Sequence, residues 1–301
     1  MGFDVVGVGA SCVDHVCRLP VFPAAGGAHA KLRMLAQSRS SGGQTATALA
    51  TCASLGLRPA YLGAIGDDDD GRRVRRELLE RGVNVEHVTV SASPTATATI
   101  LLDATGDRIV LWYREPGLCY PPDRLPVEVI TSARVVHVDD VDEPAAIAAA
   151  RIASQAGIPV TCDIDHVTPA TAELLPLISH PVFAESVPTA LTGESDPERA
   201  LRRLRRVHPG RLVVTLGERG AMALEGDMLA HMPAFSVSVV DSTGAGDVFR
   251  GAYIRALVEA WPLADSLRYA NAAAAVSCTK AGAMGGVPTA AEVEALLASR
   301  V

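Results

Sequence analysis

The chain has 301 residues, of which 49% are hydrophobic, and its formal net charge at pH 7 is −7. This length and composition predict a large hydrophobic core, and we expect residues 1–301 to form a single domain. The acidic balance argues against nucleic acid or an anionic membrane surface as a partner, and only 4% of the residues are aromatic, which makes base-stacking platforms unlikely.

The six cysteines are scattered and contain no C-x-x-C pair, which indicates free thiols, a reducing compartment and no structural metal. The first residues lack the basic and long apolar regions of a signal peptide. No apolar run reaches the roughly 18 residues needed to cross a bilayer. We therefore expect a cytoplasmic protein.

The N-terminal part begins with a predicted strand over 3–8, and Asp14 follows it closely. Asp14 is either a turn residue or a functional carboxylate. Residues 30–40 and 95–113 contain short β-prone stretches, and the second region reads as a hairpin. A helix of small residues opens after Gly42–Gly43, where the lack of side chains lets the backbone approach a ligand.

Four consecutive acids, Asp67–Asp70, precede a charged helix that runs to about Arg81. Aspartate is favoured at helix N-caps and in first turns, and the arginines that follow are typical of a solvated face. We interpret the acids as caps rather than as metal ligands.

From Ala133 onward, strands and helices alternate, which predicts a parallel sheet covered by helices on both faces. Ligands of such sheets bind beyond the carboxyl ends of the strands. Asp139 stands at one such end, and Asp163 and Asp165 stand at another. The last two are either metal or water contacts on a phosphate side or helix caps.

The region from Val239 to Gly251 holds the clearest chemical pattern. A β-branched run predicts a strand, Gly244-Ala245-Gly246 breaks it, and a helix follows, with Arg250 expected off its apolar face. The unpaired N–H groups and the dipole of a helix N-terminus form an anion site. Asp247 lies in the first turn, where it could take a proton from an attacking hydroxyl. A capped helix after a tight turn is the alternative.

This stretch, from Asp241 to Gly251, resembles the C-terminal signature of the ribokinase-like (PfkB) family of carbohydrate kinases. Further motifs extend the resemblance over essentially the whole chain. It implies a ribokinase-like α/β fold, with a mostly parallel central sheet between helices and a small β-sheet lid from about 14–40 and 95–113. It also implies that Asp247 is the catalytic base and that Gly244, Ala245 and Gly246 form the anion hole. Relatives often pair through the lid, which implies a homodimer.

The resemblance also implies a set of sugar-binding residues. Asp14 matches a residue that binds sugar hydroxyls, Gly42 and Gly43 match a Gly-Gly motif, and Thr47 stands where relatives usually carry Asn. Asp139 matches a substrate-contacting acid, and Lys31 is a candidate anchor. The local sequence is most similar to the sulfofructose kinase and ketose kinase branches. Trp112 and Val141 stand where the sulfofructose kinase branch has polar or cationic anchors, which favours a neutral ketose or furanose-type sugar.

For the nucleotide, the resemblance implies ATP bound near Thr215, Gly217 and Gly220, with Asn271 on the helix that flanks adenine and Thr243 nearby. Asp241, Thr243 and Gly282 match a monovalent-cation site, which points to K⁺. Relatives organise Mg²⁺ with Asn-x-x-Glu, but this chain has Ala184-Glu185-Ser186-Val187 there. Glu185, the Asp163–Asp165 pair or the nucleotide itself would then hold Mg²⁺.

Together these observations predict an ATP-dependent kinase that phosphorylates a primary hydroxyl of a small carbohydrate. A nucleoside kinase of the same family is one alternative. A catalytically silent sugar-binding protein is the other, favoured by Thr47 and by the missing Asn-x-x-Glu.

Overall fold

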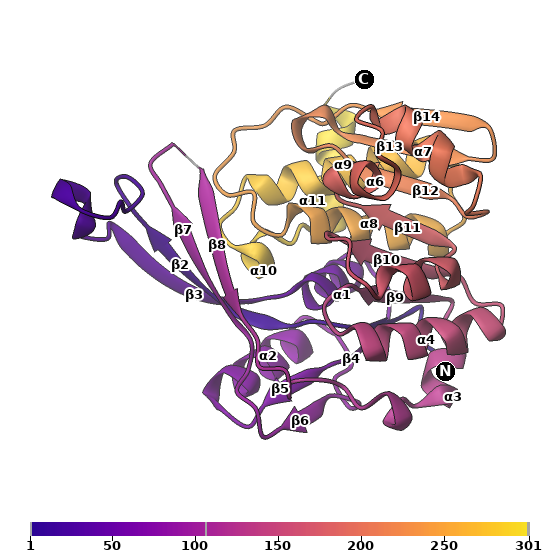
Figure 1. Ribbon diagram of the computed structural model, residues 1–301, viewed down its shortest axis with the longest axis horizontal. Helices are drawn as coiled ribbons and strands as arrows, with labels where there is room; N and C mark the ends of the chain where they lie inside the picture. Colours follow the sequence, from indigo (N-terminus) through magenta and orange to yellow (C-terminus); the bar gives the residue numbers. More distant parts are fainter. Residues whose placement is uncertain (1, 106, 300–301) are drawn as a thin grey trace.

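The computed structural model describes residues 2–105 and 107–299. Within them, one sheet of eight strands crosses the molecule in the order β14-β13-β12-β11-β10-β9-β1-β4 (Figure 1). Neighbouring strands from β4 to β12 run parallel, while β13 and β14 are antiparallel. The bounds of these strands are Val5–Val8 (β1), Pro59–Leu62 (β4), Val135–Asp139 (β9), Val160–Ile164 (β10), His180–Phe183 (β11), Leu212–Thr215 (β12), Ala221–Glu225 (β13) and Met228–Met232 (β14).

Helices cover both faces of this sheet. Alternate residues of each strand point to opposite faces, so the strands contribute to two separate hydrophobic cores. Val5 and Val135 belong to one hydrophobic core, and Val6 and Val136 belong to the other. The first core also takes residues from helices α1 (Gln44–Ser54), α2 (Asp69–Glu80), α8 (Ala245–Val258), α9 (Leu263–Cys278), α10 (Ala283–Gly286) and α11 (Ala290–Ala298). The second takes them from α3 (Val127–Thr131), α4 (Glu143–Gln155), α5 (Thr171–Leu174), α6 (Ser186–Thr192) and α7 (Pro197–Arg205).

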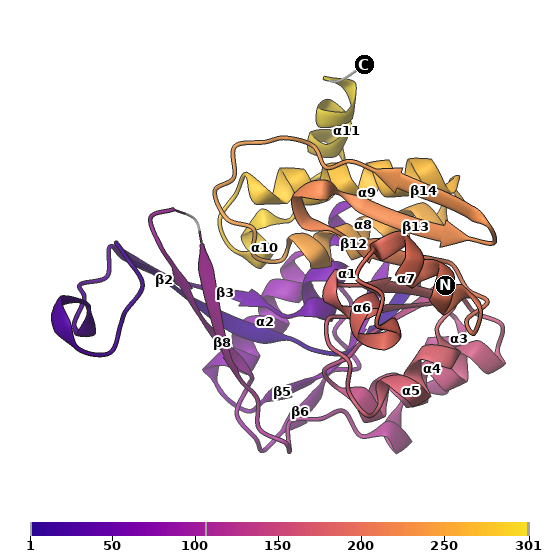
Figure 2. The same ribbon diagram turned by 45° about the horizontal axis from the view of Figure 1, so that its top comes forward.

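A smaller sheet, which we call the lid sheet, projects from this body at the left of Figures 1 and 2. Its strand order is β3-β2-β7-β8, with bounds Cys12–Arg18 (β2), Ala36–Gly42 (β3), Thr97–Leu102 (β7) and Arg108–Tyr113 (β8). Val16, Ala98, Ile100 and Leu102 form its small core. All six residues of β8 are exposed. A two-stranded sheet of β5 (Ala64–Gly66) and β6 (Thr89–Ser91) completes the strands described.

Helices α1 and α8 pack closely, as the small residues of α1 predict. A Cβ atom at Gly251 would lie 2.5 Å from the carbonyl oxygen of Ala48 and 2.6 Å from the Thr51 Cβ. Cys52 Sγ is 3.5 Å from the Gly251 carbonyl oxygen. The absent side chain at Gly251 therefore sets how near the helix that carries Asp247 comes to the one that follows Gly43.

The strand predicted at Val239–Val240 is wrong. These residues lie in an irregular connection between β14 and α8, and Val239 is 64% exposed. The N–H groups of Val240 and Asp241 donate to the Cys278 carbonyl oxygen at 2.8 and 3.2 Å. The end of α9 therefore satisfies this backbone in place of a neighbouring strand.

The structure also bears on the cysteines, on membrane-spanning helices and on the acidic run Asp67–Asp70. All six cysteines are unpaired, which confirms the free thiols. Among residues 2–105 and 107–299, no helix has both the length and the apolar character needed to cross a bilayer. Asp68 caps α2 by accepting from the Gly71 N–H, and its other contacts are with Thr95, so this part of the acidic run has a structural role.

Candidate active site

The N-terminus of α8 forms the centre of the candidate site. Gly244 precedes the helix in the left-handed conformation with φ 77°, and a Cβ atom there would lie 2.7 Å from the Ala283 Cβ, so both backbone and space require glycine. The Ala245 N–H donates to the Ser242 carbonyl oxygen at 3.2 Å. The N–H groups of Gly246 and Asp247 have no hydrogen-bond acceptor among the described residues. Of the predicted anion hole, the N–H groups of Gly244 and Gly246 thus have no acceptor among the described residues, whereas that of Ala245 is already used. The N–H group of Asp247 is a further free donor at this helix end.

Asp247 is half-buried in the first turn of α8. Burial raises the pKa of its carboxyl to about 8, and the Arg250 guanidinium opposes that rise. Asp165, Asp14 and Asp139 add to the rise through their negative charges. A carboxyl with a raised pKa beside unpaired amides is suited to take a proton from a hydroxyl.

Arg250 is buried, although the helical spacing predicted that it lies off the apolar face. It is 3% exposed, and its Nη2 atom lies 2.5 Å from Asp163 Oδ1 and 3.1 Å from Asp165 Oδ1. The Gln44 side chain donates to Asp165 Oδ2 at 3.0 Å. Arg250 is therefore buried because it pairs with the acidic side chains at the end of β10. The sequence of α8 alone does not reveal this pairing.

Asp14 lies on β2 and is 4% exposed. Burial raises the pKa of its carboxyl. Cys12 Sγ is 3.3 Å from Asp14 Oδ1. A Cβ atom at Gly42 would collide with the Asp14 carboxylate, and Gly43 has φ 100°, so both glycines of the pair are required by local geometry. The sequence prediction placed these three residues together, and they are neighbours in the structure.

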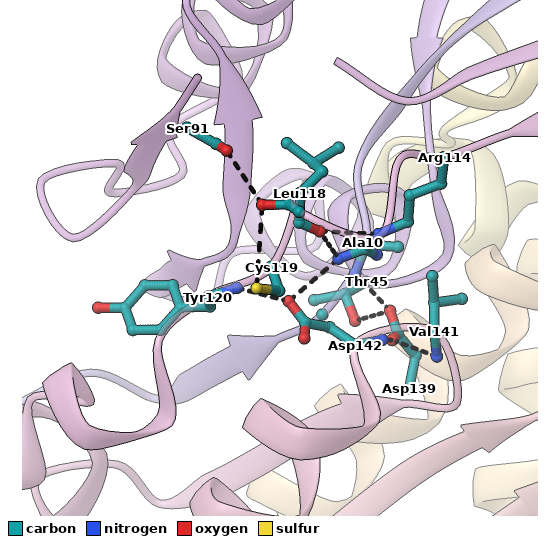
Figure 3. A network of polar contacts seen from close by, with 12 residues as sticks. Ala10, Thr45, Ser91, Arg114, Leu118, Cys119, Tyr120, Asp139, Val141 and Asp142 are labelled. Carbon is teal, nitrogen blue, oxygen red and sulfur yellow. Dashed lines mark hydrogen bonds and ion pairs between the residues drawn. The ribbon is translucent and has the colours of Figure 1, made fainter. Parts of the chain in front are cut away.

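The carboxylate of Asp139 is held by hydrogen bonds to neighbouring segments (Figure 3). It is fully buried, and its Oδ2 accepts from the Ala10 N–H at 2.6 Å and the Thr45 hydroxyl at 2.7 Å. Its Oδ1 accepts from the Val141 N–H at 3.1 Å. Both oxygens hold the chain together where β1, β9 and α1 meet, which gives Asp139 a structural role.

The neighbouring Asp142 forms a second branch of this network (Figure 3). Its Oδ2 accepts from the Tyr120 N–H at 2.8 Å and from Arg114 Nη2 at 3.1 Å. The Arg114 guanidinium also bonds to the Leu118 carbonyl oxygen. The segment that follows the lid sheet is thereby fixed to the carboxyl edge of the main sheet.

Three other predicted sugar contacts lie in different environments. Thr47 is fully buried on α1, and its hydroxyl has no hydrogen-bond partner among the described residues. Lys31 is exposed in the connection between β2 and β3, and Trp112 on β8 is 72% exposed. Arg108, which the sequence analysis did not select, hydrogen-bonds from β8 to the Ser242 hydroxyl and so joins the lid sheet to the turn before α8.

The predicted nucleotide residues lie at the end of β12 and on α9. Gly217 and Gly220 both have positive φ, 57° and 89°, and the Leu216 N–H donates to the Gly220 carbonyl oxygen. The Thr215 hydroxyl donates to the Phe183 carbonyl oxygen at 3.3 Å. Asn271 Nδ2 donates to the carbonyl oxygens of Met232 and Pro233 at 2.8 and 3.2 Å. This amide therefore fixes the end of β14.

The predicted cation residues are linked by one carboxylate. Asp241 accepts from the Thr243 N–H through Oδ1 and from the Gly282 N–H through Oδ2, each at 2.9 Å. The Thr243 hydroxyl is buried and has no hydrogen-bond partner in the described part of the chain. Glu185 is ion-paired with Arg219. Within residues 2–105 and 107–299, no group of three or more His, Cys, Asp or Glu side chains is arranged to hold a metal ion.

A family model described as "pfkB family carbohydrate kinase" matches residues 5–290. The chain belongs to this family. Fructokinase-1 of Zea mays is 32% identical over 286 residues, which cover 86% of this chain and 88% of the relative. Fructokinase-1 of Oryza sativa subsp. japonica is 32% identical over 288 residues, which cover 87% and 89%.

A solved structure of Arabidopsis thaliana ribokinase, complexed with ribose and ATP, has a TM-score of 0.87 with 25% identity, and the match covers 99% of each chain. The predicted pfkB family, the ribokinase-like fold and the enzyme class, an ATP-dependent carbohydrate kinase, are thereby confirmed. The roles of the individual site residues are separate questions. Arg250 and Arg108 are the two site residues that sequence reasoning missed, since each takes its position from partners far away in the chain.

Proposed function

We propose that this pfkB-family kinase phosphorylates a primary hydroxyl of a neutral ketose, with fructose as the first candidate, and uses Asp247 as the general base. The observation that carries the proposal is Asp247 in the first turn of α8, beside the unpaired N–H groups of Gly246 and Asp247 itself. The substrate class rests on the two plant relatives named fructokinase. Trp112 and Val141 are consistent with a sugar that carries no charge.

In the proposed reaction, the Asp247 carboxylate accepts the proton of the sugar hydroxyl while the hydroxyl oxygen forms a bond to the γ-phosphorus of ATP. The bond between that phosphorus and the β,γ-bridging oxygen breaks, and ADP leaves with the bond's electron pair. The Gly246 and Asp247 amides stabilise the negative charge on the transferred group. Asp14 would orient the sugar from the lid side, and Gly42 and Gly43 would let the backbone approach it.

We assign Mg²⁺ to the phosphates of the nucleotide, because Glu185 is paired with Arg219, and Asp163 and Asp165 are paired with Arg250. The ion would neutralise phosphate charge during transfer. For K⁺, the Thr243 hydroxyl beside Asp241 is the oxygen that lacks a partner, and it fits the donor set that such a cation prefers.

We also propose that two chains pair through their lid sheets. The edge strand β8 exposes five consecutive large hydrophobic residues, Ile109 to Tyr113, which is the pattern of an interface rather than of a solvated edge.

The test is ATP turnover by the purified protein with Mg²⁺ and K⁺, against neutral ketoses, sulfofructose, aldoses and nucleosides. Turnover stimulated by a neutral ketose above all others is the expected result. Preferred turnover of a nucleoside would replace the proposal with a nucleoside kinase. Sugar binding without turnover of any compound would indicate a silent binding protein.

A further inference from the structure

Arg250 is the only lysine or arginine that is buried within residues 2–105 and 107–299. It follows Asp247 by three positions on α8, so both side chains share one face of the helix. A buried charge is costly unless it is paired, and a surface position would have avoided that cost. The structure must therefore hold this cation in place by specific contacts.

Those contacts come from two sides of the site. On the sheet side, Nη2 lies 2.5 Å from Asp163, 3.1 Å from Asp165 and 3.4 Å from the Val182 carbonyl oxygen. On the helix side, a Cβ atom at Gly246 would lie 2.6 Å from Nη1. The guanidinium thus occupies the space that a side chain at 246 would need. It lies between the acids of β10 and the backbone whose N–H group is free.

We propose that Arg250 is a positioning residue for the proposed base: its guanidinium supplies the positive charge on the side of α8 that carries Asp247 and fixes the Gly246 side of the anion hole, while Asp163 and Asp165 balance its buried charge. The inference rests on the proposed function only for the role of Asp247. It requires no contact between Arg250 and the substrate.

The charges that face Asp247 support this assignment. Arg250 is the cation among them, and the titratable groups from the packed elements are Cys12 and Asp14 on β2, Asp139 on β9, Asp163 on β10 and Asp165 just beyond it. Burial and the acids raise the pKa of Asp247, while Arg250 lowers it. Removing the Arg250 charge should therefore raise this pKa further, and removing the Asp165 charge should lower it.

The direct test is a pH titration of protein labelled with ¹³C at the aspartate carboxyl groups. The Asp247 resonance is the one that Asp247→Asn removes. Arg250→Met removes the cation, Arg250→Lys keeps it, and Asp165→Asn removes the partly exposed acid while an amide can still contact Gln44. Arg255→Met is the matched control, because Arg255 lies on the same helix but pairs with Glu259.

We expect the Asp247 midpoint to rise by about one pH unit or more in Arg250→Met and to fall by about half a unit in Asp165→Asn. Arg250→Lys and Arg255→Met should stay within about half a unit of the parent. Shifts of the Asp247 midpoint of opposite sign in Arg250→Met and Asp165→Asn are the decisive result. A merely structural loss would move the two midpoints in the same direction or leave both unchanged. An unmoved midpoint in Arg250→Met and in Asp165→Asn overturns the inference. If Arg250→Met does not fold, Arg250→Gln, which also removes the cation, takes its place with the same expected rise.

Turnover provides the second measurement. In Arg250→Met, the acidic limb of the kcat/KM profile for the best sugar should move to higher pH by the same amount as the resonance, with KM little changed. A uniform loss at every pH without movement of the limb argues against the inference. Absence of turnover with every compound refutes the proposed function. The titration needs no substrate, so the Asp247 resonance still tests the Arg250 inference in that case.

Discussion

At the scale of single residues, the carboxylates of the site differ in what their oxygens already bind. Asp139 and Asp241 accept hydrogen bonds through both oxygens, whereas the Asp247 carboxyl accepts none from the described residues and stands beside free amides. A general base must keep its lone pairs for the substrate. The distinction between these acids follows from contacts, and residue type alone does not provide it.

We expect Asp247→Asn to lower kcat by about 10²–10⁴-fold, the usual effect of losing a general base. Steady-state turnover with the best sugar measures it. Asp265→Asn serves as the control, since Asp265 is also in the first turn of a helix, α9, but is exposed. A near-parental kcat in Asp247→Asn would remove Asp247 from the mechanism.

Gly42→Ala should raise KM for the sugar, because the new methyl group collides with the Asp14 carboxylate. Asp14 must then shift away from the position in which we expect it to bind a hydroxyl, while the base on α8 is untouched. We expect KM to rise by about tenfold or more, the effect of weakening one hydrogen bond to a charged group, with a smaller change in kcat. Gly285→Ala, where a Cβ atom meets open space, is the control. An unchanged KM would show that Asp14 does not position the sugar.

At the scale of elements, periodicity predicted most helices and strands because each buries a regular face. The strand–helix alternation predicted from Ala133 onward includes α7, Pro197–Arg205, and the predicted hairpin within 95–113 corresponds to β7 and β8. The predicted strand at Val239–Val240 does not form because β-branched residues favour a strand only where a partner strand is available. Here the carbonyl group of Cys278 is the acceptor instead.

The same limit applies to the contacts of the site residues. Asn271 has a side chain typical of a ligand contact, but its amide group donates hydrogen bonds to the backbone carbonyl oxygens of Met232 and Pro233. Arg250 has the side chain of a surface residue but pairs with Asp163 across the sheet. Signals carried by adjacent residues, such as the glycines around 244, could be found in the sequence. Those that depend on distant segments could not.

The packing of α1 against α8 makes Gly251 sensitive to any added atom. Gly251→Ala places a methyl group 2.5 Å from the Ala48 carbonyl oxygen, so the helices must separate. We expect a loss of about 1–3 kcal/mol in the free energy of unfolding, the usual cost of overpacking. Chemical denaturation measures it, with Gly285→Ala as the reference. A stability equal to that of the parent would mean that the helices separate without cost.

At the scale of the whole molecule, the exposed strand β8 predicts association of two chains. Light scattering of the parent should give the mass of a dimer, and Trp112→Arg should give a monomer, because a charge in an apolar interface is left unpaired. Val207→Arg is the matched control, since Val207 is 81% exposed on the main body, in the turn after α7. A parent that remains monomeric at micromolar concentration would contradict pairing through the lid.

The contact between α1 and α8 also has a consequence for how the protein is made. About 190 residues separate the end of α1 from the start of α8, and at synthesis rates of about 5–20 residues per second the ribosome needs roughly 10–40 s to cover that distance. Throughout this time the face of α1 that will meet Gly251 has no partner. Newly made chains should therefore depend on chaperones until the last third of the protein has emerged.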